Sequence, residues 1–243
     1  MIALFTDFGH ADPYVGQMHA VFAREAPDIP VIDLLHAVPV YNIRAGAYLL
    51  PALAGEFPPH TVFVCVVDPG VGGTRPPAML KADGRWYVGP DNGLLEIVKR
   101  RAAEAECRVI RWRPSRLSVS FHGRDLFAPV AARLSRGELP DSEPAVLTAP
   151  EGAPWPDDLA EILYVDHYGN AMTGLRASTM TPARAVRVGG EAVRYARVFS
   201  EAPPGAAFWY ENANGLVEIA VNRGHAAARL GLKPGDPVAI VET

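Results

Sequence analysis

The sequence contains little cysteine and no long apolar run. Its 243 residues include only two cysteines, Cys65 and Cys107. Each lies in an apolar stretch, which is typical of a buried small side chain rather than of a disulfide or a zinc site. Apolar runs such as TVFVCVV at 61–67 are far shorter than the roughly 20 residues of a membrane-spanning helix, and the N-terminal residues lack the basic segment of a secretion signal. We therefore expect a cytoplasmic protein without a membrane partner.

Excess basic charge and metal-ligand spacing are also absent. Lys and Arg number 23 against 27 Asp and Glu, a formal net charge of −4, so the chain lacks the basic stripe that a nucleic acid partner requires. The seven histidines show no spacing typical of metal ligands, and we expect no metal site. The glycine-rich segment VVDPGVGGTR at 66–75 has no lysine where a phosphate-binding loop needs one, which argues against a phosphate cradle.

The first part of the chain has the pattern of an α/β domain. An apolar content of 49% is enough for a sizeable core. Through residue 135, short β-branched runs alternate with amphipathic stretches, which predicts βα units on a mostly parallel sheet. The expected strands are 2–6, 30–35, 61–67 and 107–112 with a hairpin around Asp83 and Gly84, and the expected helices are 12–26, 42–54, one after Gly93, and 123–137. We place this domain at residues 1–145.

The second part of the chain predicts an all-β domain. Five prolines lie between 140 and 156 without apolar periodicity, which indicates a linker over 140–156. Beyond it, short strand-like pieces are separated by glycine and proline, the pattern of a small β-barrel or sandwich. The predicted fold is an N-terminal, mostly parallel α/β sandwich domain with a smaller C-terminal all-β barrel domain at residues 157–243.

Two acids mark a candidate site from position alone. Asp7 follows the first predicted strand and Asp68 follows the third, and the carboxyl ends of neighbouring parallel strands form the ligand crevice of an open α/β sheet. His122 precedes a predicted helix, whose N-terminal dipole favours a neutral imidazole or a bound anion. Such residues also have ordinary structural interpretations. Asp68 begins a good Pro-Gly turn, and Asp12, at the start of the first predicted helix, is a helix cap first and a ligand second. The residues alone predict a crevice with acids and a histidine, but no reaction.

Six ordered motifs resemble one enzyme family. They are TDFG at 6–9, VVDPGVGGTR at 66–75, GPDNGLL at 89–95, FHGRDLFAPVAA at 121–132, VDHYGN at 165–170 and GLVEIAVNRGHAAARLGLKPGD at 215–236. Together they resemble the S-adenosyl-L-methionine hydroxide adenosyltransferases, which hydrolyse S-adenosylmethionine to adenosine and methionine and are homologous to the fluorinase and chlorinase enzymes. The resemblance spans nearly the whole chain. It implies the two-domain fold above, no cofactor, and a homotrimer that binds its small-molecule substrate at the subunit interfaces.

The resemblance assigns the family's catalytic Asp-Arg-His side chains to Asp68, Arg75 and His122. In that assignment the three groups hold a water molecule, and the glycines of the turn let the backbone and the ribose approach closely. Arg75 keeps its charge and stabilises developing hydroxide, so it is not the base. Either Asp68 or His122 takes the proton, and the sequence leaves both open.

The resemblance also assigns residues to each part of the substrate. Asp7 accepts hydrogen bonds from the ribose hydroxyls, and Tyr41 stands where the halogenating relatives carry a tryptophan packed by the sugar. Asn170 reads the adenine edge through its amide. The remaining assignments are Tyr168 and Phe199 as stacking partners of the base, the backbone from Val221 to Arg223 as an adenine contact, and Asp12, Tyr14 and Asp166 near the methionine portion.

Departures from the halogenases favour the hydrolytic branch. Asp68 and Val71 stand where those enzymes carry Tyr and Thr, and His122 and Gly123 stand where they carry Tyr and Ser. A carboxylate at position 68 repels halide. The halogenases carry a Ser-Arg pair at the positions of Ala213 and Asn214. We therefore expect backbone N–H groups to bind the methionine carboxylate in this chain. Two alternatives remain: a non-catalytic module that binds S-adenosylmethionine or adenosine, and a chlorinase-like enzyme that uses halide.

Overall fold

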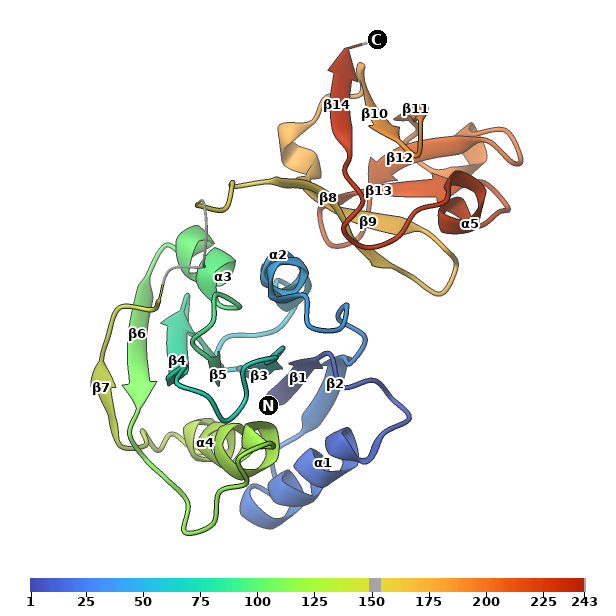
Figure 1. Ribbon diagram of the computed structural model, residues 1–243. Helices are drawn as coiled ribbons and strands as arrows, with labels where there is room; N and C mark the ends of the chain where they lie inside the picture. The colour runs from blue at the N-terminus through green and yellow to red at the C-terminus, as the bar shows by residue number, and fades with distance from the viewer. Residues whose placement is uncertain (149–153, 243) are drawn as a thin grey trace. The chain divides into compact units, whose positions relative to one another are not determined.

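The chain folds into two compact units, Met1–Pro154 and Trp155–Thr243. A computed structural model describes residues 1–148 and 154–242. The first unit is a sheet covered by helices and the second is a curled sheet (Figure 1). Among the described residues, no helix combines the length and the apolar character needed to cross a lipid bilayer.

The first unit is built on a seven-stranded sheet in the order β2-β1-β3-β5-β4-β6-β7. Pairing is parallel from β2 to β5 and antiparallel from β5 to β7. The predicted hairpin joins β4 to β5, and Asp83 and Gly84 both have positive φ angles, 45° and 78°, as a type I′ turn requires. The strands are β1 (Ile2–Thr6), β2 (Val31–Leu35), β3 (Val62–Val66), β4 (Pro77–Ala82), β5 (Arg85–Pro90), β6 (Ala105–Ile110) and β7 (Ser142–Pro144).

Helices cover both faces of this sheet (Figure 1). They are α1 (Pro13–Glu25), α2 (Ile43–Ala54), α3 (Glu96–Arg101), the π-helix η1 (Gly123–Phe127) and α4 (Ala128–Ser135). α1 begins as predicted, with Pro13 first and Asp12 in the cap position, although the Asp12 side chain accepts no capping hydrogen bond. At the start of α2 the Asn42 side chain accepts a hydrogen bond from the Ala45 N–H over 2.9 Å, and the helix continues through Pro51.

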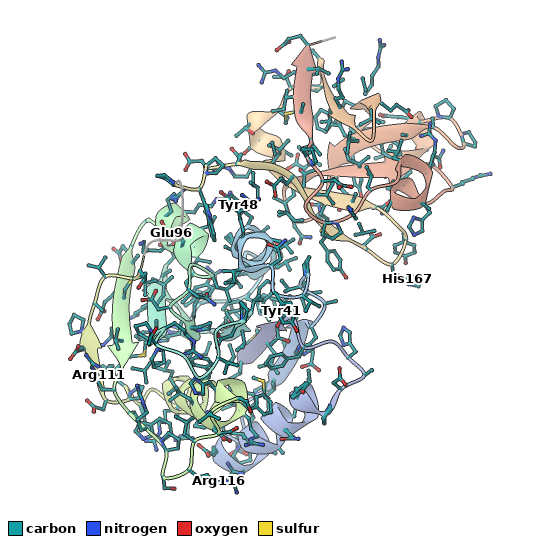
Figure 2. The ribbon with its side chains drawn as sticks, viewed as in Figure 1. Tyr41, Tyr48, Glu96, Arg111, Arg116 and His167 are labelled. Carbon is teal, nitrogen blue, oxygen red and sulfur yellow. The ribbon has the colours of Figure 1, made fainter. Side chains whose placement is uncertain are left out.

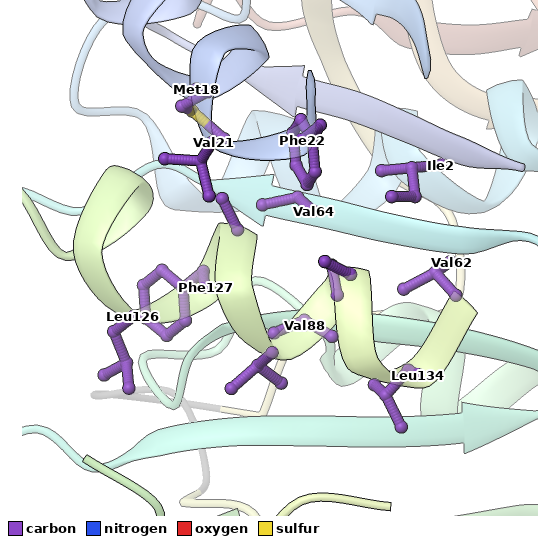
Figure 3. Packing of buried hydrophobic residues seen from close by; sticks show 14 of the residues in the cluster. Ile2, Met18, Val21, Phe22, Val62, Val64, Val88, Leu126, Phe127 and Leu134 are labelled. Atoms are coloured by element: carbon purple, nitrogen blue, oxygen red, sulfur yellow. The ribbon is translucent and has the colours of Figure 1, made fainter. Parts of the chain in front are cut away.

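The main core of the first unit lies between the sheet and the pair α1 and α4. Met18, Val21 and Phe22 of α1 pack on Val62 and Val64 of β3, and Figure 3 shows this packing together with side chains of α4. All five residues of β3 are buried, as expected for a central strand that is covered on both faces. This burial confirms the predicted place of β3 and fixes where its carboxyl end emerges.

Part of the expected linker is folded. Within 140–156, Ser142–Pro144 forms β7 and pairs with β6. Arg108 of β6 donates through Nε to the Ser142 hydroxyl and through Nη2 to the Ser142 carbonyl, both over 3.0 Å. Proline is tolerated there because β7 is the edge of the sheet, so proline content alone gave a wrong prediction for this strand. Residues 149–153 of the expected linker lie outside the described residues.

The second unit is a curled, barrel-like sheet in the order β14-β10-β11-β12-β13-β9-β8. One face carries a core around Trp209, Val217 and Ile219. The alternate residues Phe208 and Tyr210 pack on the other face. The elements are β8 (Leu159–Val165), β9 (Ala171–Arg176), η2 (Ala177–Thr179), β10 (Arg184–Val188), β11 (Glu191–Tyr195), η3 (Phe199–Glu201), β12 (Ala207–Glu211), β13 (Leu216–Val221), α5 (Ala226–Leu230) and β14 (Ala239–Glu242).

Candidate active site

The carboxyl ends of β1 and β3 form the rim of a cavity in the first unit. The two strands pair in parallel and Thr6 lies opposite Val66, so the residues that follow them emerge at the same edge. The cavity has a volume of about 230 Å³. Its lining includes Asp7, Tyr14, Tyr41, Asp68, Val71 and His122. The acids at positions 7 and 68 therefore meet at one rim, as the strand pattern predicted.

Asp68, Arg75 and His122 converge at this rim. Arg75 donates through Nε to Asp68 Oδ1 over 3.0 Å and through Nη2 to Asp68 Oδ2. The same Nη2 donates to His122 Nδ1 over 2.8 Å. The Asp68 and Arg75 side chains are only 4% and 11% exposed, and a bidentate pair with so little solvent holds its geometry firmly. The structure thus brings together the three side chains that the resemblance assigns to catalysis.

The contact with Arg75 determines the tautomer of His122. A guanidinium has donors only, so Nδ1 of His122 is the acceptor and the neutral ring carries its proton on Nε2. Burial and the positive charge of Arg75 both lower the pKa of His122, which favours the neutral ring. His122 occupies the cap position of η1, so the predicted place of this histidine before a helix is correct.

The glycines at 70–73 let their turn approach the loop that carries His122. The turn is closed by a hydrogen bond from the Val71 N–H to the Asp68 carbonyl over 3.2 Å. Gly72 has a φ of +79°, and a Cβ there would lie 2.3 Å from the Val119 carbonyl oxygen. Only glycine satisfies both demands. The run VVDPGVGGTR therefore packs two loops together, and this packing brings Arg75 within reach of His122.

Asp7 faces the same cavity from the end of β1. Its Oδ2 accepts a hydrogen bond from the Tyr41 N–H over 2.9 Å. Tyr41 lies in the connection from β2 to α2, with a φ of 62° and an exposed side chain (Figure 2). Burial raises the pKa of Asp7, backbone hydrogen bonds oppose the rise, and the negative charge of Asp68 adds to it. The two acids are thus close enough to affect each other's charge.

The second unit has a pocket of its own, with a volume of about 500 Å³. It contains the residues that the resemblance assigns to adenine, together with Asp166. Tyr168 and Phe199 supply aromatic rings that are 74% and 38% exposed, so their faces are available to a flat ligand. The assigned residues that line the pocket are Asp166, Tyr168, Asn170, Phe199, Val221 and Arg223.

Asp166 orients Asn170 in this pocket. The backbone N–H of Asn170 donates to Asp166 Oδ1 over 2.8 Å, and its Nδ2 donates to Asp166 Oδ2 over 3.1 Å. A carboxylate has acceptors only, so the amide of Asn170 cannot be reversed without losing a bond. Asn170 is 6% exposed. Its amide is therefore held in one orientation.

Tyr210 lines the same pocket, and sequence reasoning missed it. Its hydroxyl donates to Glu218 Oε1 over 2.5 Å, and Asn212 Nδ2 donates to Glu218 Oε2 over 2.7 Å. Glu218 is 2% exposed, and burial raises its pKa. The strand AFWYE is apolar on both faces, so no periodicity indicates which face lines a pocket.

Two of the residues assigned to the substrate lie outside both pockets. Asp12 and Ala213 are exposed and line neither pocket. The first cavity also contains Phe8 and Phe121, which the sequence did not single out; their rings pack at 5.9 Å between centroids. Their only signal was adjacency to Asp7 and to His122.

Across residues 1–148 and 154–242, no cluster of three or more His, Cys, Asp or Glu side chains is arranged to hold a metal ion.

Known proteins resemble this chain over its whole length. A model of the S-adenosyl-L-methionine hydroxide adenosyltransferase N-terminal domain matches residues 2–143, and a model of the C-terminal domain of that family matches residues 160–239. The (R)-S-adenosyl-L-methionine hydrolase of Salinispora arenicola (strain CNS-205) is 42% identical over 98% of this chain and 97% of its own. A fluorinase of Actinopolyspora mzabensis is 27% identical over 75% of this chain and 74% of its own. The crystal structure of an uncharacterized conserved protein from Thermotoga maritima superposes with a TM-score of 0.86 at 33% identity, covering 100% of both chains.

Proposed function

The chain belongs to the S-adenosyl-L-methionine hydroxide adenosyltransferase family, and on that premise we propose that it hydrolyses S-adenosyl-L-methionine to adenosine and L-methionine. The Salinispora relative is named for the (R) form of this substrate, so we take the (R) form as the substrate to test first. The geometric support is the convergence of Asp68 and His122 on Arg75 at a cavity that also contains Asp7.

The bond to be broken joins ribose C5′ to a positively charged sulfur. Methionine leaves as a neutral thioether, so its departure needs no acid. The attacking water oxygen forms the new bond to C5′ while the C5′–S bond breaks, and the water gives up one proton. The enzyme's task is to place that oxygen in line with the C5′–S bond and to stabilise its developing negative charge, which is the work of fixed dipoles and charges. The charge of Arg75 performs this stabilisation.

In this proposal Asp68 takes the proton. Nδ1 of His122 already accepts from Arg75, and Nε2 carries the ring proton, so neither nitrogen offers a lone pair to water. Each oxygen of the Asp68 carboxylate keeps a second lone pair beside the one that Arg75 uses. His122 instead donates through Nε2–H and orients the water. The hydrogen bonds thus favour one of the two bases that the sequence left open.

We propose substrate-binding roles for other residues of the two pockets. Asp7 binds the ribose hydroxyls, with Tyr14 and Tyr41 beside it in the first-unit cavity. Asn170 and the rings of Tyr168 and Phe199 bind adenine in the second-unit pocket. We also propose that the protein needs no cofactor, acts in the cytoplasm, and forms a homotrimer in which a neighbouring subunit supplies the adenine pocket.

Product analysis tests the reaction. Purified protein is incubated with the (R) and the (S) forms of S-adenosyl-L-methionine, and adenosine and methionine are measured by chromatography. We expect equimolar release of both products from the (R) form. Binding without any product would instead indicate a non-catalytic module. A 5′-chloro nucleoside formed in excess chloride would indicate a halide-using enzyme.

A further inference from the structure

A buried chain of hydrogen bonds lies behind Asp7, and no step of the proposed reaction uses it. His36 at its centre is fully buried. Its Nε2 bonds to Asp33 Oδ1 over 3.0 Å, and its Nδ1 bonds to the Thr6 hydroxyl over 2.7 Å. We propose that His36 is a positioning residue, which fixes the turn carrying Asp7 by way of Thr6. This inference rests on the proposed function for its kinetic test, but not for its binding test.

For a neutral His36 ring, the hydrogen-bond partners determine every proton in this chain. The Asp33 carboxylate only accepts, so Nε2 of His36 donates to it and Nδ1 of the neutral ring is left as an acceptor. The Thr6 hydroxyl then donates to Nδ1. Its oxygen accepts in turn from the Phe8 N–H over 3.2 Å. The order of donors therefore runs from the backbone of Phe8 through Thr6 and His36 to Asp33.

Asp33 anchors the outer end of the chain at the surface. Its side chain is 45% exposed, and the same Oδ1 also accepts from His19 Nε2 over 2.8 Å. Partial burial acts to raise the pKa of Asp33, but the hydrogen bonds from His36 and His19 outweigh it and the pKa is lowered. Asp33 thus stays ionised and keeps the ring of His36 in one orientation. The ring of His10 also contacts His36, edge to face at 5.5 Å between centroids.

A hydrolytic triad has the same residue types as the group Asp33, His36 and Thr6. In this group, however, a substrate cannot reach the threonine. Thr6 is fully buried in β1, so its oxygen cannot reach a substrate carbonyl. A nucleophile must be able to approach its target within about 3.5 Å. The arrangement therefore serves structure, and its structural target is the turn that follows β1.

Three hydrogen bonds tie that turn to the segment that contains His36. In addition to the bond between the Thr6 hydroxyl and His36, the Val38 N–H donates to the Thr6 carbonyl over 3.2 Å and the Gly9 N–H donates to the His36 carbonyl over 2.7 Å. Thr6 and Gly9 bracket Asp7 and Phe8. The orientation of the Asp7 carboxylate, which the ribose is proposed to contact, therefore depends on this connection.

The same turn also touches the loop that carries His122. Phe8 packs closely on Gly123, where an added Cβ would lie 3.3 Å from the Phe8 ring. A displaced turn would therefore disturb the ribose contact first, and the reacting centre second. We expect loss of the His36 bond to raise KM more than it lowers kcat.

Matched substitutions separate positioning from folding. Thr6→Val keeps the shape of the side chain and removes the hydroxyl, while Thr6→Ser restores it. His36→Asn keeps a polar atom near Nδ1, where Thr6 bonds, whereas His36→Gln keeps one near Nε2, where Asp33 bonds. The control is His19→Asn, which loses the Nε2 bond to the same Asp33 oxygen and leaves the hydrogen bond between Thr6 and His36 in place. Each variant is assayed for KM, kcat and thermal midpoint, and for adenosine binding by calorimetry.

We expect Thr6→Val and His36→Gln to raise KM about tenfold, on the scale of one lost bond to a buried group, and to change kcat less than about threefold. Thr6→Ser, His36→Asn and His19→Asn should stay within about twofold of the parent. A folded Thr6→Val variant with unchanged KM would overturn the proposal, as would a His19→Asn variant impaired as much as His36→Gln. If the parent hydrolyses no substrate, the proposed function fails, and the same ranking of variants is then sought in adenosine affinity.

Discussion

A single arginine connects the groups on which the proposed chemistry depends. Arg75 donates to both oxygens of Asp68 and to Nδ1 of His122, and its planar guanidinium supplies donors in both directions at once. It therefore keeps Asp68 paired and sets the tautomer of His122. Because the three side chains share bonds, the effects of removing them should not add.

Asp68→Asn should abolish turnover without unfolding the protein. Asparagine has nearly the same shape but cannot take a proton, so we expect kcat to fall by about 100-fold or more, the usual scale of general-base catalysis. Adenosine release measures the loss, and adenosine affinity should change little. The control is Asp28→Asn, at an exposed turn position. A folded Asp68→Asn enzyme that keeps full turnover would remove Asp68 from the mechanism.

Arg75→Lys should also be strongly damaging, although the charge is kept. An ammonium group cannot bond both Asp68 oxygens and His122 Nδ1 in one plane. We expect kcat to fall by about tenfold or more, measured by the same release assay. Near-normal turnover would show that charge alone suffices and that the fork of hydrogen bonds is dispensable.

His122 should be neutral at pH 7, with its proton on Nε2. Burial and the charge of Arg75 both lower its pKa, so the ring should gain a proton only below the ordinary value of about 6.5. Protonation would place a hydrogen on the nitrogen that faces Arg75, and activity should therefore fall as the pH drops through this lowered pKa. Long-range ¹⁵N–¹H spectra report the tautomer and its titration, and the pKa should rise in Arg75→Met. A ring protonated on Nδ1 at pH 7 would contradict the assignment.

At the scale of elements, the site depends on loops that approach each other closely. The turn 68–73 and the loop before His122 meet where Gly72 lies against the Val119 carbonyl. Strands β1 and β3 set the rim, but this loop contact decides whether Arg75 reaches His122. The shape of the turn is therefore part of the proposed catalytic arrangement.

Gly72→Ala should impair activity more than an equally strained substitution elsewhere. Alanine at a φ of +79° is strained, and its Cβ would also collide with the Val119 carbonyl oxygen, so the turn must move. Gly137→Ala is the matched control, with a φ of +81° and open space around the new Cβ. Both should lose about 1–2 kcal/mol of stability from backbone strain, measured by thermal unfolding. Only Gly72→Ala should also lose about tenfold or more in kcat, and equal kinetics would contradict this account of the turn.

The elements that could be predicted are those with local signals. The Asp83-Gly84 hairpin and the start of α1 after Asp12 follow from neighbouring residues, and the parallel order of β1 and β3 places Asp7 beside Asp68. Contacts between distant segments carry no such signal, as with Gly72 against Val119. The apolar spacing predicts an ordinary helix from Gly123, whereas the structure begins with the π-helix η1, because one wider turn hardly changes that spacing. The edge strand β7 was missed because its stability comes from bonds to β6.

At the scale of the whole molecule, the proposed substrate residues divide between two pockets of the chain. The first-unit cavity, at about 230 Å³, is smaller than the roughly 300 Å³ at which pockets for drug-sized ligands begin. It is therefore small for a substrate of the size of S-adenosyl-L-methionine. The residues proposed for adenine line the pocket of the second unit. The proposed homotrimer makes a neighbouring subunit the source of that pocket.

Mixing two inactive variants tests this sharing. Asp68→Ala loses the base and Asn170→Ala loses the adenine contact, so each homotrimer should be nearly inactive. After joint unfolding and reassembly in equal amounts, about a quarter of the sites should combine two intact halves if assembly is random. Light scattering should give a mass three times the 26.1 kDa of one chain. A monomer, or a trimer without restored activity, would refute the shared site.

The central claim is that a water molecule held by Asp68, Arg75 and His122 attacks ribose C5′. Hydrolysis of (R)-S-adenosyl-L-methionine in H₂¹⁸O, followed by mass spectrometry of the adenosine, tests this most directly. We predict one ¹⁸O atom in the 5′-hydroxyl of the adenosine formed by the parent enzyme, and no product above background from Asp68→Asn. Adenosine without the label, or labelled adenosine formed equally fast by Asp68→Asn, would contradict the account.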